Sequence, residues 1–372
     1  TTISAPQLNE CNKLSIQANA ALTSISFPAL AKSSLYVIGD SALTSVSLPS
    51  FTDSKEIFSF SSNVSFVNLN IPVLNLAKDI SIGSNPALAS LSFPSLTNSR
   101  NISVTSCAAL PSLSLPQATA CENISIASCP ALSSLSLPQL VTCGNIDIQN
   151  VAINNLSSFP VLQTSKNITL NFNPNLTAIS FPALTTMGVF KLGYDPTAPY
   201  INLSTLNLPQ LVTADGFDLI KVQLSSLSLP SLVTINKTFS LNIISISSIN
   251  APLLSTAGLF YIVDCTPVSS ISFPSLTTLS DSTTYSSVGS CTSLASISFD
   301  NLSVFKNTGF ISTNNQFPSA QVNYLLNKFV NIAPPIRNKI FNFFQPVAAP
   351  PTGQGITDKA TLVARPNIVT TN

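Results

Sequence analysis

The chain has 372 residues and a net charge of +1, and only 8% of its residues are charged, against about a quarter in an average protein. This balance excludes the basic surface of a nucleic-acid-binding protein and any electrostatic attraction to an anionic membrane. The chain has no His and its acidic residues are scattered, so we expect no enzyme, no cofactor and no metal. A polysaccharide-acting enzyme that uses carboxylates alone is the alternative. No apolar run reaches the roughly 18 residues of a membrane span.

A repeat of about 22 residues runs through residues 1–302. Its clearest mark is a proline that follows an L-x-L or I-x-F pair. Because proline donates no hydrogen bond to a β-ladder, we expect each of these prolines to mark a corner where a strand ends. They are Pro6, Pro28, Pro49, Pro72, Pro94, Pro116, Pro138, Pro160, Pro182, Pro209, Pro230, Pro252 and Pro274, and Asp300 takes their place in the last unit.

The best-defined unit, residues 121–140, reads CENISIASCPALSSLSLPQL and contains two stretches in which apolar residues alternate with Ser. Alternation with period 2 predicts half-buried strands. Strands of three or four residues are too short to stand alone, so successive coils must stack and pair with one another. We therefore predict a mostly β fold, a right-handed β-solenoid of about 14 coils.

A second column lies nine residues before each proline, and its first members are mostly Asn, Asp and Cys. The column consists of Asn19, Asp40, Asn63, Asn85, Cys107, Cys129, Val151, Asn173, Tyr200, Lys221, Ile243, Cys265 and Cys291. A buried Asn there would bond the backbone of a tight turn and of the neighbouring coil.

The pattern Ile124-x-Ile126-x-x-Cys129-x-x-Leu132 resembles the Asn/Cys ladder of leucine-rich repeats, L-x-L-x-x-N/C-x-L. It departs from that ladder by one extra residue after the Cys and by a second strand in place of a helix. The chain is thus similar to the β-rich leucine-rich-repeat proteins of microbial surfaces. This resemblance implies a repeat solenoid at an extracellular, cell-surface or virion-surface location.

Cysteines stand at equivalent positions of neighbouring coils. The pairs are Cys107 with Cys129, Cys121 with Cys143, and Cys265 with Cys291. Stacking would bring each pair to a Cα separation of about 5 Å, which is within the range for a disulfide. Disulfides and ladders of buried free thiols are both compatible with this spacing. Cys11 shares the position of Cys121 but has no cysteine in the next coil.

Nine N-x-S/T sequons occur, about as many as the Asn, Ser and Thr content gives by chance, so their number is no evidence of glycosylation. Asn101, Asn123 and Asn167 share one outward-facing position and are the best candidates. The others are Asn63, Asn155, Asn175, Asn202, Asn236 and Asn301.

Two insertions lengthen the repeat, LGYDPTAPY at residues 192–200 and SDSTTYSS at residues 280–287. Insertions in solenoids form loops, often on the binding face. Tyr194, Asp195 and Tyr200 in the first loop and Tyr285 in the second are therefore candidate ligand-binding residues. Ordinary surface bulges are the alternative.

The repeat ends after Leu302, and residues 303–372 are predicted to form a small α/β cap. Apolar spacing in residues 318–332 predicts a helix with Ser319 as its N-cap. A strand in KIFNFF, a short helix that begins near Thr357 or Asp358, and a strand in NIVTT follow. The last 24 residues resemble the ending of leucine-rich surface or tail-associated proteins of bacteria and phages, except for Pro366, where that ending usually carries Gly.

The chain begins in mid-repeat, since residues 3–8 match the second strand and corner of a coil. An uncapped half-coil exposes strand edges, and a contact that does not close yields a filament. We therefore expect a non-catalytic structural protein that assembles head to tail with copies of itself into a filament or surface array. The contact would involve Thr1, Ile3, Pro6, Leu8 and Cys11. An adhesin or phage receptor-binding protein that recognises a host glycan or protein is the alternative.

Overall fold

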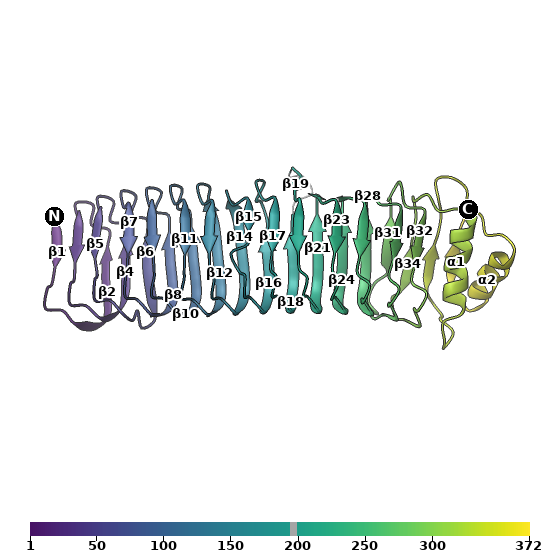
Figure 1. Cartoon of the computed structure of the whole chain (residues 1–372), viewed down its shortest axis with the longest axis horizontal. Coiled ribbons are helices and arrows are strands. Elements are labelled where there is room, and N and C mark those ends of the chain that lie inside the picture. The colour runs from purple at the N-terminus through teal and green to yellow at the C-terminus, as the bar shows by residue number, and fades with distance from the viewer. Residues whose placement is uncertain (194–198) are drawn as a thin grey trace. The chain divides into compact units, whose positions relative to one another are not determined.

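The computed structural model describes residues 1–193 and 199–372 and confirms the predicted solenoid. The chain is 44% strand and 6% helix, and its parallel strands form about 14 turns (Figure 1). Two small helices lie near the C-terminus. The chain divides into two compact units, Thr1–Leu184 and Thr185–Asn372, which are described separately below.

The first unit contains a ladder of long parallel strands and several ladders of short ones. The long strands are β2 (Glu10–Gln17), β4 (Lys32–Ile38), β6 (Ile57–Ser61), β8 (Leu76–Gly83), β10 (Asn98–Thr105), β12 (Ala120–Cys129), β14 (Thr142–Val151) and β16 (Thr164–Leu170). The short strands are β1 (Thr2–Ser4), β3 (Ser24–Ser26), β5 (Ser45–Ser47), β7 (Asn68–Asn70), β9 (Ser90–Ser92), β11 (Ser112–Ser114), β13 (Ser134–Ser136), β15 (Asn155–Leu156) and β17 (Ala178–Ser180).

Each long strand pairs with the equivalent residues of the next coil. Ile102, for example, lies opposite Ile124, which lies opposite Ile146. Ile124 and Ile126 are buried, whereas Ser125 between them faces outward. The alternation of apolar residues with Ser therefore predicted both the strands and the face that forms the core.

The second unit repeats this arrangement and adds the helices. Its longer ladder contains β18 (Thr186–Leu192), β21 (Thr213–Ile220), β24 (Thr234–Asn242), β27 (Thr256–Val263), β30 (Thr278–Leu279), β31 (Ser286–Gly289), β33 (Val304–Phe305), β34 (Gly309–Ile311), β35 (Ile340–Asn342) and β36 (Ile368–Thr370). Its short strands are β19 (Ile201–Asn202), β20 (Thr205–Asn207), β22 (Val222–Gln223), β23 (Ser226–Ser228), β25 (Ser245–Ile246), β26 (Ser248–Asn250), β28 (Thr266–Pro267), β29 (Ser270–Ser272) and β32 (Ser296–Ser298).

Residues 303–372 contain both helices, α1 (Ser319–Val330) and α2 (Gln354–Ala364), together with β33 to β36. These strands continue the parallel ladder of the coils, since β31 pairs with β34, β34 with β35 and β35 with β36. The N-cap of α1 is Pro318 and not Ser319, which is the first helical residue. Helix α2 begins at Gln354, about one turn before its predicted start, because Gly353 supplies the corner with a positive φ of 51°. No helix in the described residues is long and apolar enough to cross a membrane.

The repeated prolines mark corners as predicted. Pro28 lies between Phe27 and Leu30 in a turn closed by a 3.2 Å hydrogen bond from the Leu30 N–H to the Phe27 carbonyl. The position after the first turn residue suits proline, because the ring fixes φ near the required value and no N–H is needed.

The polar column forms a buried ladder at the other corner. In the first unit the Asn63 Oδ1 accepts a hydrogen bond from the Asp40 N–H at 3.0 Å, and the Asn63 Nδ2 donates to the Val37 carbonyl at 2.9 Å. Asn85 repeats this geometry one coil further along. The side chains thus satisfy backbone groups that the turn leaves without partners.

The column is shifted by one residue in three coils of the second unit, contrary to the prediction. The residue before a ladder position has a positive φ, as Ser128 does before Cys129 (56°). Lys221 itself has a φ of 53°, and the buried residue is Val222. The interval from the buried residue to the proline is one residue shorter in these coils. Counting nine residues back from the proline therefore ends on the turn residue that precedes the buried one. By burial, the ladder positions predicted at Tyr200 and Ile243 belong to Ile201 and Ile244.

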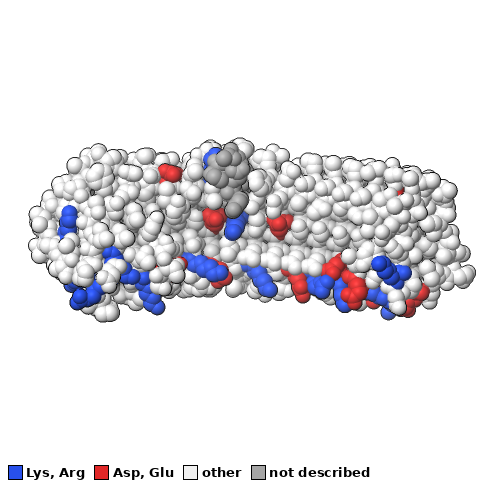
Figure 2. Space-filling view, turned by 180° about the vertical axis from the view of Figure 1, so that it is seen from behind, with Lys and Arg blue, Asp and Glu red and all other residues white. Residues whose placement is uncertain are grey.

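Charged side chains are unevenly distributed over the surface. On the side shown in Figure 2 they gather mainly along one edge of the coils, and much of the remaining surface is uncharged. In the first unit, ion pairs link Lys55 to Glu10 at 2.8 Å and Lys78 to Glu56 at 2.5 Å. Opposite charges are thus paired with one another along the coils of the first unit, whereas residues 303–372 carry six Lys and Arg side chains and one Asp.

Candidate functional site

A groove crosses the outward face of four neighbouring strands in the second unit, β18, β21, β24 and β27. Its main row consists of Lys191, Asp218, Ser240 and Tyr261, which lie opposite one another in direct register. The cavity volume is about 350 Å³, which is in the size range of small-molecule sites.

The floor of the groove departs from the repeat. The outward position two residues before the main row holds Val189, Gly216, Thr238 and Leu259. In the first unit the equivalent position carries a row of Asn side chains, described below. Because Gly216 has no side chain and Val189 and Leu259 are apolar, the second unit has a hollow with a partly apolar floor.

A β-bulge in β24 shapes one wall of the groove. The register between β21 and β24 shifts after Ala214, and the register between β24 and β27 shifts after Ile235. The extra residue brings Lys237 to the groove. Its carbonyl oxygen would lie only 2.0 Å from a Cβ on Gly258, so the bulge requires glycine at that position of β27.

The second predicted insertion forms the opposite wall, and Thr284 and Tyr285 line the groove. The loop is held at its base by Asn307, which is fully buried. The Asn307 Nδ2 donates to the carbonyl oxygens of Gly258 (2.9 Å) and Asp281 (2.7 Å), and its Oδ1 accepts from the Ser286 hydroxyl at 2.6 Å. The loop is therefore fixed in place in the described structure.

Within the loop, the Asp281 carboxylate accepts hydrogen bonds from the Thr283 hydroxyl (2.6 Å) and the Thr283 N–H (2.7 Å). These bonds hold the pKa of Asp281 below its usual value. The turn before Tyr285 is thus locked by its own side chains.

Aromatic and polar groups converge in this groove. The Tyr261 and Tyr285 side chains are 40% and 44% exposed, so each offers ring surface to a ligand. The Asp218 Oδ1 is shielded from solvent and accepts no hydrogen bond from the described residues. An acceptor in this state is costly unless a donor reaches it. The exposed Lys237 ammonium lies 3.5 Å from the Asp215 carboxylate, so the charges of these two side chains partly neutralise one another.

The groove contains one of the four predicted ligand-loop residues, Tyr285. Tyr200 is exposed but does not line the groove, and the Lys221 Nζ lies 5.8 Å from its ring centre. Tyr194 and Asp195 lie outside the described residues. Tyr261 was not among the residues predicted from the sequence, although a signal existed, since Tyr261 stands where most coils have Ser or Thr.

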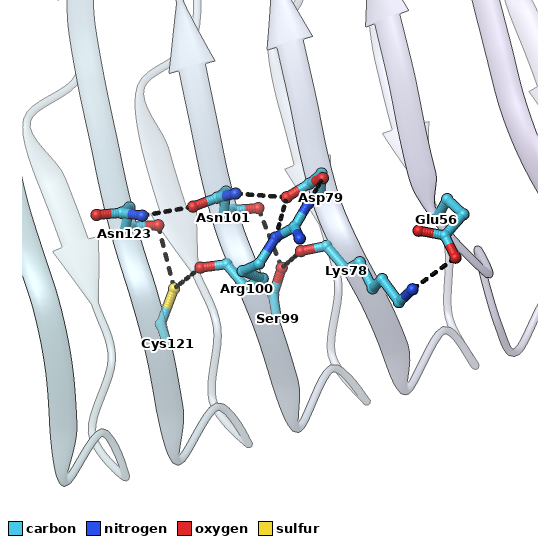
Figure 3. A network of polar contacts seen from close by, with 8 residues as sticks. All are labelled: Glu56, Lys78, Asp79, Ser99, Arg100, Asn101, Cys121 and Asn123. Atoms are coloured by element: carbon cyan, nitrogen blue, oxygen red, sulfur yellow. Dashed lines mark hydrogen bonds and ion pairs between the residues drawn. The ribbon is translucent and has the colours of Figure 1, made fainter.

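The first unit carries a row of polar side chains at the repeat position that forms the floor of the groove in the second unit (Figure 3). The Asn101 Nδ2 donates to the Asp79 Oδ1 at 2.5 Å, and each following Asn donates to the one before it. The steps are Asn123 to Asn101 (2.6 Å), Asn145 to Asn123 (2.6 Å) and Asn167 to Asn145 (2.8 Å). Arg100 pairs with Asp79 at the end of the row, and its hydrogen bond lowers the pKa of that carboxyl.

This row includes the three best sequon candidates, Asn101, Asn123 and Asn167, whose Nδ2 atoms all donate within it. Asn63 is fully buried in the corner ladder, so the folded chain does not expose it for glycosylation. The remaining sequon residues, Asn155, Asn175, Asn202, Asn236 and Asn301, are exposed. Glycosylation at these five stays a prediction.

All seven cysteines carry free thiols in the structure. Cys121 lies opposite Cys143, and the Cys265 N–H donates to the Cys291 Sγ at 3.4 Å, so the expected stacking of cysteines is present. The hydrogen bond with Cys129 and burial raise the pKa of Cys107. The Cys11 Sγ lies 3.2 Å from the Ser33 hydroxyl, so a Ser occupies the place of the missing thiol partner.

The N-terminal residues of the predicted contact are largely exposed. The Thr1 amino group donates to the Ala21 carbonyl at 3.0 Å, and β1 pairs with β3. Ile3 is 37% exposed, Pro6 is exposed, and Leu8 and Cys11 are half-buried. Self-association through these residues stays a prediction.

Comparison with models of known protein families gave no match, and comparison with curated proteins gave none either. The class that the geometry defines is a repeat β-solenoid with a preformed groove on its face.

Proposed function

We propose that the chain is a non-catalytic recognition protein and that the groove in its second unit binds a carbohydrate. The observation that carries this proposal is the convergence of two exposed Tyr rings and a carboxylate on one hollow with fixed walls. A preformed site loses little conformational entropy when a ligand binds, which favours affinity.

The chemistry of the groove suits a sugar ring. Tyr261 and Tyr285 offer flat apolar surfaces with polar tips, which match the apolar faces and hydroxyl edges of a sugar. Ser240 and Thr238 supply hydroxyls that can exchange hydrogen bonds with the hydroxyls of a sugar. Opposite charges are balanced in the groove, so a neutral or weakly charged ligand fits best.

The ladder geometry and the composition support a proposal for the protein class and its location. Corner residues such as Asn63 and Asn85 bind the backbone as the Asn/Cys ladder of leucine-rich repeats does, which supports a distant relation to that class. A surface with few charges and many Ser, Thr and Asn side chains supports an extracellular, cell-surface or virion-surface location.

The test is binding of the full chain to an array of neutral and acidic oligosaccharides, followed by titration calorimetry with the best ligand. We expect Tyr261→Ala and Tyr285→Ala each to weaken binding by about tenfold or more, because truncating a central aromatic contact costs at least about 1.4 kcal/mol. Tyr36→Ala is the matched control. Tyr36 stands at the same outward repeat position in the first unit, between Ser15 and Ser59, and does not line the groove. Absence of oligosaccharide binding, or equal binding by all three variants, would contradict the proposal.

A further inference from the structure

A pair of thiols in the first unit is arranged as a binding site that is independent of the groove. Cys121 in β12 and Cys143 in β14 lie directly opposite one another. The same column holds Ser99 on one side and Ser165 on the other. Two sulfur atoms therefore stand together, flanked by hydroxyl groups.

These two thiols are reachable from solvent through a notch of about 530 Å³. Its rim carries Glu122 on one side and Lys166 on the other, and Gly144 between them has no side chain. Cys121 and Cys143 keep 7% and 4% of their surface exposed. The other two stacked pairs, Cys107 with Cys129 and Cys265 with Cys291, are fully buried.

The spacing of the strands decides whether the two thiols favour a disulfide or a bound metal ion. Neighbouring parallel strands lie about 4.8 Å apart, so side chains in direct register start from about that separation. A disulfide tolerates this Cα separation but needs its Cβ atoms about 3.5–4.5 Å apart, which is slightly closer than direct register places them. By contrast, two metal–sulfur bonds of about 2.3 Å placed end to end span about 4.6 Å. A linear sulfur–metal–sulfur unit therefore fits the register without moving the backbone.

We propose that Cys121 and Cys143 bind one soft, two-coordinate metal ion of the Cu(I) class. Thiolates select such ions over Mg²⁺ or Ca²⁺, and Zn²⁺ would need four ligands, which the pair does not supply. Each thiol releases its proton to solvent as its sulfur bonds the metal, so two protons leave and the complex carries one net negative charge. The ion enters and stays as Cu(I), and no electron is transferred.

The two sulfur atoms have exchangeable hydrogen-bond partners and a charged neighbour. Each sulfur donates to backbone oxygens, Cys121 to Asn123 at 3.1 Å and Cys143 to Asn145 at 3.5 Å, and these bonds are replaced when the metal binds. Lys166 at the rim supplies a positive charge near the anionic complex.

The test is titration of the full chain with Cu(I), added as its acetonitrile complex without oxygen, and native mass spectrometry. We expect one tightly held ion per chain, and at least tenfold weaker binding for Cys121→Ser and for Cys143→Ser. Both variants should fold, because Ser occupies this column in neighbouring coils. Cys11→Ser is the matched control, since Cys11 shares the repeat position but faces Ser33.

Alkylation of the free thiols with and without Cu(I) gives a second measurement that does not depend on any variant. Bound metal should protect Cys121 and Cys143 together. The proposal is overturned if no ion is retained, if Cys143→Ser binds as well as the unaltered chain, or if the first ion protects Cys107 with Cys129 or Cys265 with Cys291.

Discussion

Single buried amides hold the corners of the coils together. Asn63 shows this most fully, because its backbone N–H, its Oδ1 and its Nδ2 each have a partner in a neighbouring coil. Two backbone groups, the Asp40 N–H and the Val37 carbonyl, thus depend on this one side chain for a hydrogen bond. Polar groups in this situation make a large contribution to stability because water cannot replace the lost partner.

We expect Asn63→Ala to lower the free energy of unfolding by about 3 kcal/mol, since it leaves the Asp40 N–H and the Val37 carbonyl buried without partners. Chemical denaturation followed by circular dichroism measures the change. Asn68→Ala is the control, because Asn68 is exposed in the short strand β7, and its substitution should cost less than about 0.5 kcal/mol. Equal losses in the two variants would show that the corner ladder does not stabilise the fold.

At the scale of the strand, glycine is needed where a neighbouring backbone comes too close for a side chain. A Cβ on Gly144 in β14 would lie 2.2 Å from the Glu122 carbonyl oxygen. Arg100, Glu122 and Lys166 occupy the same repeat position in other coils, so the requirement belongs to this strand and not to the repeat. The same glycine opens the notch above Cys121 and Cys143.

Gly144→Ala should therefore destabilise the chain by about 1–3 kcal/mol, because β14 must move away from β12. Gly83→Ala is the comparison. Its Cβ would approach the Thr105 hydroxyl at 3.2 Å, and that group can rotate aside. Thermal denaturation of both variants distinguishes them, and a Gly144→Ala variant as stable as Gly83→Ala would refute the close approach.

At the scale of the whole molecule, the charge pattern limits the possible partners. The net charge is +1, and opposite charges in the first unit are paired between coils one or two repeats apart. Long-range attraction to a polyanion needs a surface of one sign, and the paired charges of the first unit cancel within a Debye length.

The full chain should therefore pass through a heparin column without retention at about 0.15 M salt. Elution position against salt concentration is the measurement. Retention that weakens steadily as salt rises would reveal a basic surface and would contradict the exclusion of nucleic acid as a partner. The carbohydrate proposal is unaffected by this result, because the groove fits a neutral or weakly charged sugar.

The repeat determined most of the fold. Period-2 alternation at residues 124–126 and 134–136 predicted strands, and the recurrence of Pro and Asn at fixed intervals predicted corners and stacking. These features are local, or they repeat identically in each coil, so counting along the chain recovers them. Counting nine residues back from the proline gave the turn residue Lys221 and not the buried ladder position, because the interval is one residue shorter in that coil.

The candidate sites were decided by tertiary structure, because they depend on departures from the repeat that meet across coils. Tyr285 could be suspected from its insertion, but its position beside Tyr261 and Asp218 follows from the bulge in β24 and from the bonds of Asn307. Likewise, the spacing of Cys121 and Cys143 indicated that they stack. Only the notch beside Gly144 shows that this pair, unlike the other two, can be reached from solvent. A repeat specifies one coil and its successor, whereas a site arises where neighbouring coils differ.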